Sequence, residues 1–120
     1  MTETASPNIY QEGNVTVIAL GEDYESVDET VLTDLRDVIL KAADEADPPL
    51  VVLDLSHTTF FGSSFIELIF RAWNRVQAKE GGKFAISGLT HYCREVISIT
   101  HLDQLWSIYD NLDEAVKALS

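Results

Sequence analysis

Apolar runs and amphipathic segments alternate along the chain, and the apolar runs predict the strands of a sheet. Residues 15–20 (Val-Thr-Val-Ile-Ala-Leu) and 50–55 (Leu-Val-Val-Leu-Asp-Leu) are nearly all apolar and rich in β-branched side chains. This pattern is typical of strands that are covered on both faces. A tight turn at Gly13-Asn14 predicts that the first two strands pair as a hairpin. The predicted strands cover residues 8–12, 15–20, 50–55, 83–87 and 105–109.

Apolar residues recur at three- and four-residue spacing between the strands, which predicts amphipathic helices. Three of the four predicted helices begin with a Ser or Asn that is followed by Glu three residues later, the pattern of a capping box. These boxes predict Ser26, Ser64 and Asn111 as the N-caps. The first predicted helix begins after Ser26 and ends before Asp47-Pro48-Pro49. The other three cover residues 64–79, residues 90–99 and the residues from Asn111 to Leu119.

The resulting order, β-β-α-β-α-β-α-β-α, predicts an α/β fold with right-handed crossovers. We expect a mixed, mostly parallel sheet of four to five strands with about four helices. A chain of 120 residues is the size of one domain. We therefore expect a single domain over residues 8–120, preceded by a flexible tail over residues 1–7.

The charge narrows the classes of partner. The chain has 8 Lys and Arg against 20 Asp and Glu, a formal charge of −12, while 46% of its residues are hydrophobic. Such a protein is expected to fold, and it repels nucleic acids and anionic membrane surfaces. Cys93 is the sole cysteine, so neither an intramolecular disulfide nor a thiolate metal cluster is expected. Because the sequence shows neither a signal-peptide pattern nor an apolar stretch long enough to span a membrane, we expect a cytoplasmic protein.

Enzyme motifs are absent from the sequence, so we expect no enzyme, no cofactor and no metal. It contains neither a glycine-rich dinucleotide loop nor a phosphate-binding loop. The histidines, at 57, 91 and 101, lack ligand spacing and are expected on the surface. Arg94 can lower the pKa of Cys93, although a structural thiol is the simpler interpretation. Asp54 is either a functional acid or, more simply, a carboxylate satisfied by backbone donors where its strand ends.

The informative segment is the turn that joins the strand at 50–55 to the next helix. Sites in open α/β sheets gather at such turns, because helix N-termini present unpaired N–H groups. If Ser64 is the N-cap, Ser63 lies just outside the helix with no structural role. A phosphate on Ser63 would then face the helix N-terminus, which tolerates negative charge. The alternative is that both serines merely compete to cap the helix.

Residues 15–119 resemble the STAS-domain family of bacterial anti-sigma factor antagonists. The matching features are the strand at 51–55, the aromatic pair before Gly62-Ser63-Ser64, the helix up to Trp73, the Gly81-Gly82 turn and the closing strand and helix. In that family the turn usually reads Asp-Ser-Ser-Gly, and a partner anti-sigma factor phosphorylates its first serine. That serine falls on Ser63. This chain departs from the family in having Gly62 in place of the Asp and Phe65 in place of the Gly.

The resemblance implies a switchable binding module rather than an enzyme. Its unphosphorylated form would bind an anti-sigma factor that has serine kinase activity, and its phosphorylated form would not. The implied phosphorylation site is Ser63, with Ser64 as the second candidate. The resemblance is also compatible with a weak homodimer. The implied partner-binding residues are Glu22, Asp23, Tyr24, Gly62, Ser63, Ser64, Phe65 and Glu67.

Two other classes of function stay open at the level of sequence. One is an interaction protein without a switch, either a scaffold of a stress-sensing complex or an accessory subunit of a transporter. A scaffold would form large assemblies in gel filtration. The other is a small hydrolase that uses Ser63, which would need a base that the sequence does not place beside that serine.

Overall fold

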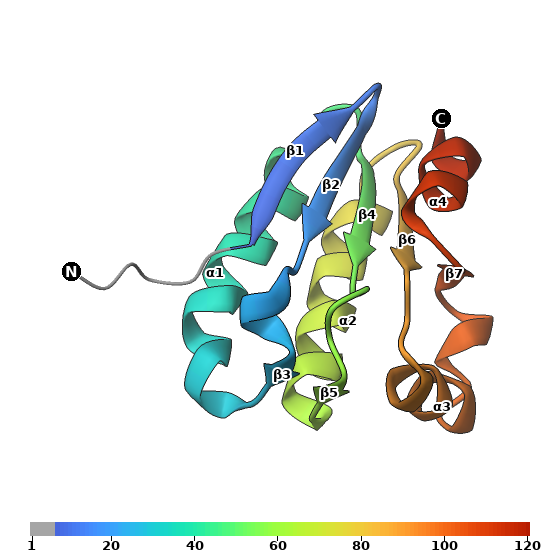
Figure 1. Cartoon of the computed structure of the whole chain (residues 1–120). Coiled ribbons are helices and arrows are strands. Elements are labelled where there is room, and N and C mark those ends of the chain that lie inside the picture. Colours follow the sequence, from blue (N-terminus) through green and yellow to red (C-terminus); the bar gives the residue numbers. More distant parts are fainter. Residues whose placement is uncertain (1–6) are drawn as a thin grey trace.

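The apolar runs form the centre of a five-stranded sheet with the order β1-β2-β4-β6-β7 (Figure 1). In this computed structural model, which describes residues 7–120, the strands are β1 (Asn8–Glu12), β2 (Val15–Ala19), β4 (Leu50–Asp54), β6 (Lys83–Ser87) and β7 (Ser107–Tyr109). β1 is antiparallel to β2, and the other neighbours are parallel. The α/β fold class with a mostly parallel sheet is therefore confirmed. Residues 1–6 of the expected flexible tail lie outside the described residues, and Pro7 is buried.

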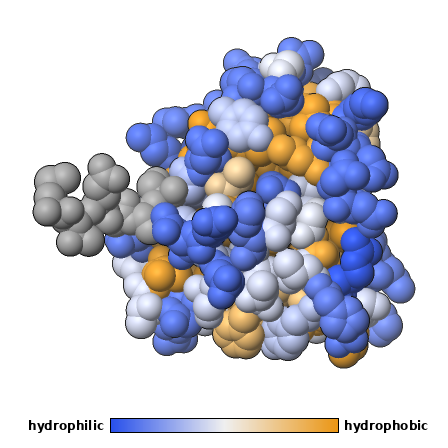
Figure 2. Space-filling model, viewed as in Figure 1, coloured by the Kyte–Doolittle hydropathy of each residue, from blue (hydrophilic) through white to orange (hydrophobic). Residues whose placement is uncertain are grey.

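Four helices cover the sheet unequally. α1 (Glu29–Glu45) and α2 (Ser63–Gln77) lie side by side against one face, and α3 (His91–Ile99) lies beyond the end of β6 (Figure 1). Side chains of these three helices share one large core with the sheet. α4 (Leu112–Leu119) packs against β4, β6 and β7 on the opposite face, over a smaller core. On the side seen in Figure 2, hydrophobic residues gather over the strands beside α4, and hydrophilic residues cover most of the periphery.

A second, very small sheet ties together two loops at the carboxyl ends of the strands. β3 (Ser26–Val27) and β5 (Phe60–Phe61) pair in parallel. Residues 7–120 also contain two short 3₁₀ helices, η1 (Glu22–Tyr24) before β3 and η2 (Leu102–Gln104) after α3. The prediction that Ser26 caps the first helix is wrong, because Ser26 pairs with Phe60 in this small sheet. The N-cap of α1 is Asp28, whose carboxylate accepts a hydrogen bond from the backbone N–H of Thr30 at 2.9 Å.

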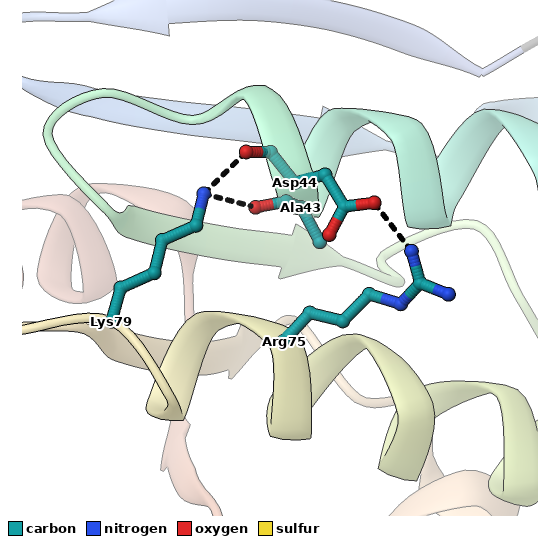
Figure 3. A network of polar contacts seen from close by, with 4 residues as sticks. All are labelled: Ala43, Asp44, Arg75 and Lys79. Carbon is teal, nitrogen blue, oxygen red and sulfur yellow. Dashed lines mark hydrogen bonds and ion pairs between the residues drawn. The ribbon is translucent and has the colours of Figure 1, made fainter.

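The C-terminal ends of α1 and α2 are joined by charged side chains, as Figure 3 shows. The guanidinium of Arg75 forms an ion pair with the Asp44 carboxylate. The Lys79 ammonium donates hydrogen bonds to the backbone carbonyls of Ala43, at 3.3 Å, and of Asp44. These carbonyls belong to the last turn of α1, where no intrahelical donor is available. Lys79, two residues after the end of α2, therefore caps α1 and fixes this end of the helix pair.

Candidate functional site

The candidate site lies where the chain passes from β4 through β5 into α2. The hydroxyl of Thr58 donates to the backbone carbonyl of Tyr24 at 2.9 Å, and Thr58 is fully buried. The N–H groups of Thr59 and Phe60 both donate to the carbonyl of Glu25, at 2.7 and 3.1 Å. The loop that leads to Ser63 is thereby held against the acidic loop that leads to α1.

Ser63 is the first residue of α2 and its side chain is exposed. The N-cap is Gly62, so the predictions that Ser64 caps the helix and that Ser63 lies outside it are wrong. The carbonyl of Gly62 accepts from the N–H groups of Phe65 and Ile66, at 3.1 and 3.4 Å, and starts the helix one residue earlier. Glu67, the acid of the predicted capping box, pairs with Arg71 at 3.2 Å instead.

The N-terminus of α2 is electrostatically open. Within residues 7–120, no side chain caps it, its first turn contains no acidic residue, and the N–H groups of Ser63 and Ser64 have no acceptor. Unpaired N–H groups and the helix dipole together favour an anion at this position. The end of α2 therefore favours an anion beside Ser63, while the Asp28 and Glu29 carboxylates that line the adjoining cavity oppose one.

The N-terminus of α1 lies beside that of α2 and is already balanced by acids. Asp28 caps it, and hydrogen bonds from the Thr30 hydroxyl and N–H hold the pKa of the Asp28 carboxyl below its usual value. Glu29 follows as the first helical residue. Its carboxylate accepts a hydrogen bond from the Ser64 hydroxyl at 3.4 Å, which joins the two helix ends.

A small cavity of about 190 Å³ opens between these two helix ends. Its apolar lining comes from buried or partly exposed side chains, and its polar lining consists of two acids and two serines. The residues that line it are Val27, Asp28, Glu29, Leu32, Phe60, Gly62, Ser63, Ser64 and Phe65. A cavity of about 150 Å³ can hold a benzene ring, so this one can receive a single large side chain.

The structure places the predicted partner-binding residues in two groups. Glu22, Asp23, Ser63 and Glu67 are exposed, and Gly62 and Ser64 are half-buried beside them. Tyr24 and Phe65, in contrast, are 3% and 1% exposed and belong to the core. Burial is the main cause that raises the pKa of Tyr24, with Asp23 and Asp34 adding to it. The side chains of Tyr24 and Phe65 therefore support the site from below instead of presenting a contact surface.

Two exposed aromatic residues next to the site, Phe60 and Tyr92, were not predicted as contact residues from the sequence. Phe60 and Tyr92 are 43% and 44% exposed, and their rings stack with centroids 5.6 Å apart. Phe60 belongs to β5 and Tyr92 to α3, so their contact depends on the tertiary fold. The one available signal is the Phe60-Phe61 pair itself, since alternation in a strand places one of two neighbouring aromatic side chains outside.

The surroundings of the other candidate residues, which are Asp54, Cys93 and the three histidines, fit structural roles. Asp54 is buried, and one carboxylate oxygen accepts hydrogen bonds from the hydroxyls of Ser56 and Ser87, both at 2.8 Å, where backbone donors were expected. Cys93 is buried, and burial raises the pKa of its thiol. Arg94 does not lower it, because the guanidinium pairs with Asp110 at 2.9 Å. All three histidines are exposed, as predicted.

None of the described helices combines the length and the apolar character needed to cross a membrane. Among residues 7–120, no group of three or more His, Cys, Asp or Glu side chains is placed to hold a metal ion.

Comparison with known proteins agrees with this fold and connectivity. Residues 6–115 match the model of the STAS domain family. An anti-sigma-factor antagonist (STAS) domain protein from Planctomyces limnophilus is 36% identical, with a TM-score of 0.91 over 96% of this chain and 98% of that one. An anti-sigma factor antagonist from Mycobacterium paratuberculosis is 24% identical, with a TM-score of 0.80 over 95% and 92% of the two chains. The Bacillus cell fate determinant SpoIIAA, in its phosphorylated form, is 16% identical, with a TM-score of 0.68 over 96% and 100%. No curated protein matches the chain.

The fold is thus that of a small α/β domain with its candidate site at the start of α2. The chain belongs to the STAS domain family.

Proposed function

We propose that this chain is an anti-sigma factor antagonist whose binding is switched by phosphorylation of Ser63. In its unphosphorylated form it holds an anti-sigma factor that is also a serine kinase, and so frees a sigma factor in the bacterial cytoplasm. Phosphorylation of Ser63 releases the partner. The chain acts by binding and performs no reaction of its own.

The observation that carries this proposal is the position of Ser63. It is exposed at the first residue of α2, and within residues 7–120 the N–H groups of Ser63 and Ser64 have no acceptor. A kinase can reach such a hydroxyl, and the helix end tolerates the resulting phosphate. The same position matches the phosphorylated serine of the family turn, and two of the structural relatives are anti-sigma factor antagonists by name.

The contact surface proposed for the partner includes this serine, and we call it the Ser63 face. It consists of the exposed or half-buried residues Glu22, Asp23, Phe60, Gly62, Ser63, Ser64, Glu67 and Tyr92. The stacked rings of Phe60 and Tyr92 give it the aromatic anchor that protein interfaces favour. A phosphate in this surface would have to lose its water when the partner docks, and that desolvation opposes binding.

The test is a capture experiment followed by a binding measurement. The tagged protein is isolated from its native lysate, its partner is identified by mass spectrometry, and the peptide containing Ser63 is examined for phosphate. The purified partner is then titrated with the wild type and with the Ser63→Ala and Ser63→Asp variants. We expect Ser63→Ala to retain binding and Ser63→Asp to lose at least about tenfold in affinity.

A matched control variant tests whether the loss of affinity depends on where the negative charge is added. Ser98 is exposed on α3, so Ser98→Asp adds the same charge at another helix and should bind like the wild type. Equal affinity of Ser63→Ala and Ser63→Asp for the partner would falsify the switch. A partner without kinase activity, captured together with a large assembly in gel filtration, would favour the scaffold alternative.

A further inference from the structure

Thr90 occupies the N-cap position of α3, and its hydroxyl does not serve that helix. Threonine is one of the residues that normally accept a hydrogen bond from an N–H group of the helix they precede. Among residues 7–120, however, no side chain caps α3. The Thr90 hydroxyl instead donates to the backbone carbonyl of Thr58 at 2.6 Å, in the loop between β4 and β5 that leads to Ser63. The helix thus forgoes a cap, and the loop gains a contact with α3.

Thr58 is a fixed point in that loop. Its side chain is fully buried, and its hydroxyl donates to the carbonyl of Tyr24 at 2.9 Å. The thiol of Cys93 in α3 also donates to the Thr58 carbonyl, with sulfur and oxygen 3.5 Å apart. The hydrogen bonds of Thr58 therefore connect three segments, which are the acidic loop, the loop between β4 and β5, and the start of α3.

The exposed aromatic pair joins two of these segments. Tyr92 lies two residues after Thr90, and Phe60 lies two residues after Thr58. Their rings stack with centroids 5.6 Å apart, next to the hydrogen bond between Thr90 and Thr58. Because Tyr92 is 44% exposed, the core contributes little to fixing its ring. The hydrogen bond from Thr90 is thus the contact that is placed to hold Tyr92 against Phe60.

We propose that Thr90 is a positioning residue for the partner site, because it holds the start of α3 against the loop between β4 and β5. Tyr92 and Phe60 then form a single aromatic contact for the partner. This inference rests on the proposed function, in which the Ser63 face is the surface that the partner binds. The benefit is preorganisation, since rings that are already ordered lose less conformational freedom when a partner docks.

The first experiment needs no partner and asks whether Thr90 places the ring of Tyr92. Thr90→Val keeps the shape of the side chain and removes the hydroxyl, whereas Thr90→Ser keeps the hydroxyl. NMR cross-relaxation between the ring protons of Phe60 and Tyr92 reports their stacking, and the amide signals of α4 confirm that each variant is folded. We expect the signal between the rings to fall at least about twofold in Thr90→Val and to stay at the wild-type level in Thr90→Ser.

The matched control is Thr100→Val, the same substitution at the other end of α3. The Thr100 hydroxyl also donates to backbone carbonyls, those of Val96 at 2.7 Å and Ile97 at 3.1 Å, but these belong to α3 itself. Thr100→Val should therefore leave the signal between the rings unchanged. If the signal persists in Thr90→Val, or falls equally in Thr100→Val, Thr90 does not position the aromatic pair and the proposal is overturned.

The second experiment uses the captured partner and measures an effect that a loss of stability alone does not produce. Tyr92→Ala should weaken binding at least about tenfold in the wild type, and about threefold or less in the Thr90→Val background, where the ring is no longer held in place. Thr90→Val alone should weaken binding at least about threefold, and Thr90→Ser should bind within about twofold of the wild type. Equal effects of Tyr92→Ala in the two backgrounds, or none in the wild type, would overturn the role of Thr90.

The outcomes also separate this inference from the proposed function. If Ser63→Asp binds like the wild type while Thr90 and Tyr92 are coupled, the switch fails and the role of Thr90 stands. If Ser63→Asp weakens binding while Thr90 and Tyr92 are not coupled, the switch stands and the role of Thr90 is rejected. If the capture yields no partner, the proposed function fails, and the NMR comparison still decides whether Thr90 positions the aromatic pair.

Discussion

The two ends of the same helix pair differ in how firmly they are joined. At the C-terminal ends, Arg75 pairs with Asp44, and Lys79 caps the last turn of α1 (Figure 3). At the N-terminal ends, the backbone pairing of β3 with β5 holds the segments that precede the two helices, and the helices themselves are joined by one long side-chain hydrogen bond, between Ser64 and Glu29, beside a cavity of about 190 Å³. We infer that side chains join the α1–α2 pair more firmly at the first end, which we call the fixed end, than at the second, which we call the adjustable end and which carries the candidate regulatory serine.

The largest expected effect on stability comes from removing a buried side chain beneath the adjustable end. Phe65 is buried below Ser63, and its ring lies 5.5 Å from that of Phe61. Phe65→Ala should lower the free energy of unfolding by about 3–5 kcal/mol, because it removes a buried ring and leaves a cavity. Urea denaturation measures this loss. The exposed Phe60→Ala serves as the control, with an expected loss below about 1 kcal/mol, and equal losses would contradict the placement of the two rings.

The next effect tests the caps at the two N-termini. Asp28→Ala removes the side chain that accepts from the N–H of Thr30, so the thermal midpoint should fall by about 4 °C. Ser63→Ala removes no cap, because within residues 7–120 no side chain caps α2, and should leave the midpoint within about 1 °C. Comparable losses in calorimetry would show that both helix ends depend on their side chains.

The same cap predicts a dependence on pH. The pKa of Asp28 is lower in the folded protein than in the unfolded chain, because the ionised carboxylate accepts hydrogen bonds from Thr30. Its contribution is therefore present above the unfolded pKa of about 4 and is lost as the pH falls through the folded value. Thermal midpoints of the wild type and of Asp28→Ala should differ at pH 7 and converge towards pH 2. A constant difference over this range would contradict the role of the ionised cap.

Much of the fold could be predicted from the sequence, because periodicity and turn residues report local structure. The capping box at Asn111 is correct: its side chain accepts from the N–H of Glu114 at 2.9 Å. The same pattern failed at Ser26 and at Ser64. Ser26 is drawn into a strand by Phe60, which lies 34 residues away, and nothing local in the sequence reports that pairing. The sequence thus predicted the main elements and missed the small sheet.

The candidate site was predictable in position and less so in composition. Ser63 could be singled out because it lies in the turn between a strand and a helix, and through the family resemblance. The burial of Tyr24 and Phe65 depends on how the loops fold over the core. The stacking of Phe60 on Tyr92 and the contact of Glu29 with Ser64 join segments that are far apart in the chain. Such contacts follow from tertiary packing, which one sequence does not report.

A smaller effect is expected at the fixed end of the helix pair. Lys79→Met keeps much of the aliphatic side chain and removes the ammonium that binds the carbonyls of Ala43 and Asp44. We expect the free energy of unfolding to fall by about 0.5–1 kcal/mol, since the contact is partly exposed. Binding of the partner to the Ser63 face should be unaffected, which a titration checks. Loss of binding in a variant that still folds would show that the two ends are coupled.

The smallest expected effect on stability comes from adding a side-chain cap to the N-terminus of α2, which has none among residues 7–120. At Gly62 the backbone is extended, and a Cβ built there meets no atom within 4 Å, so Gly62→Asp introduces a carboxylate without a clash. That carboxylate can accept from the N–H groups of α2 and should raise the free energy of unfolding by about 0.5 kcal/mol. It also occupies the helix end that a phosphate on Ser63 would use. The stability gained from Gly62→Asp should therefore disappear when Ser63 carries phosphoserine, and urea unfolding of the four proteins would show whether one helix end serves both groups.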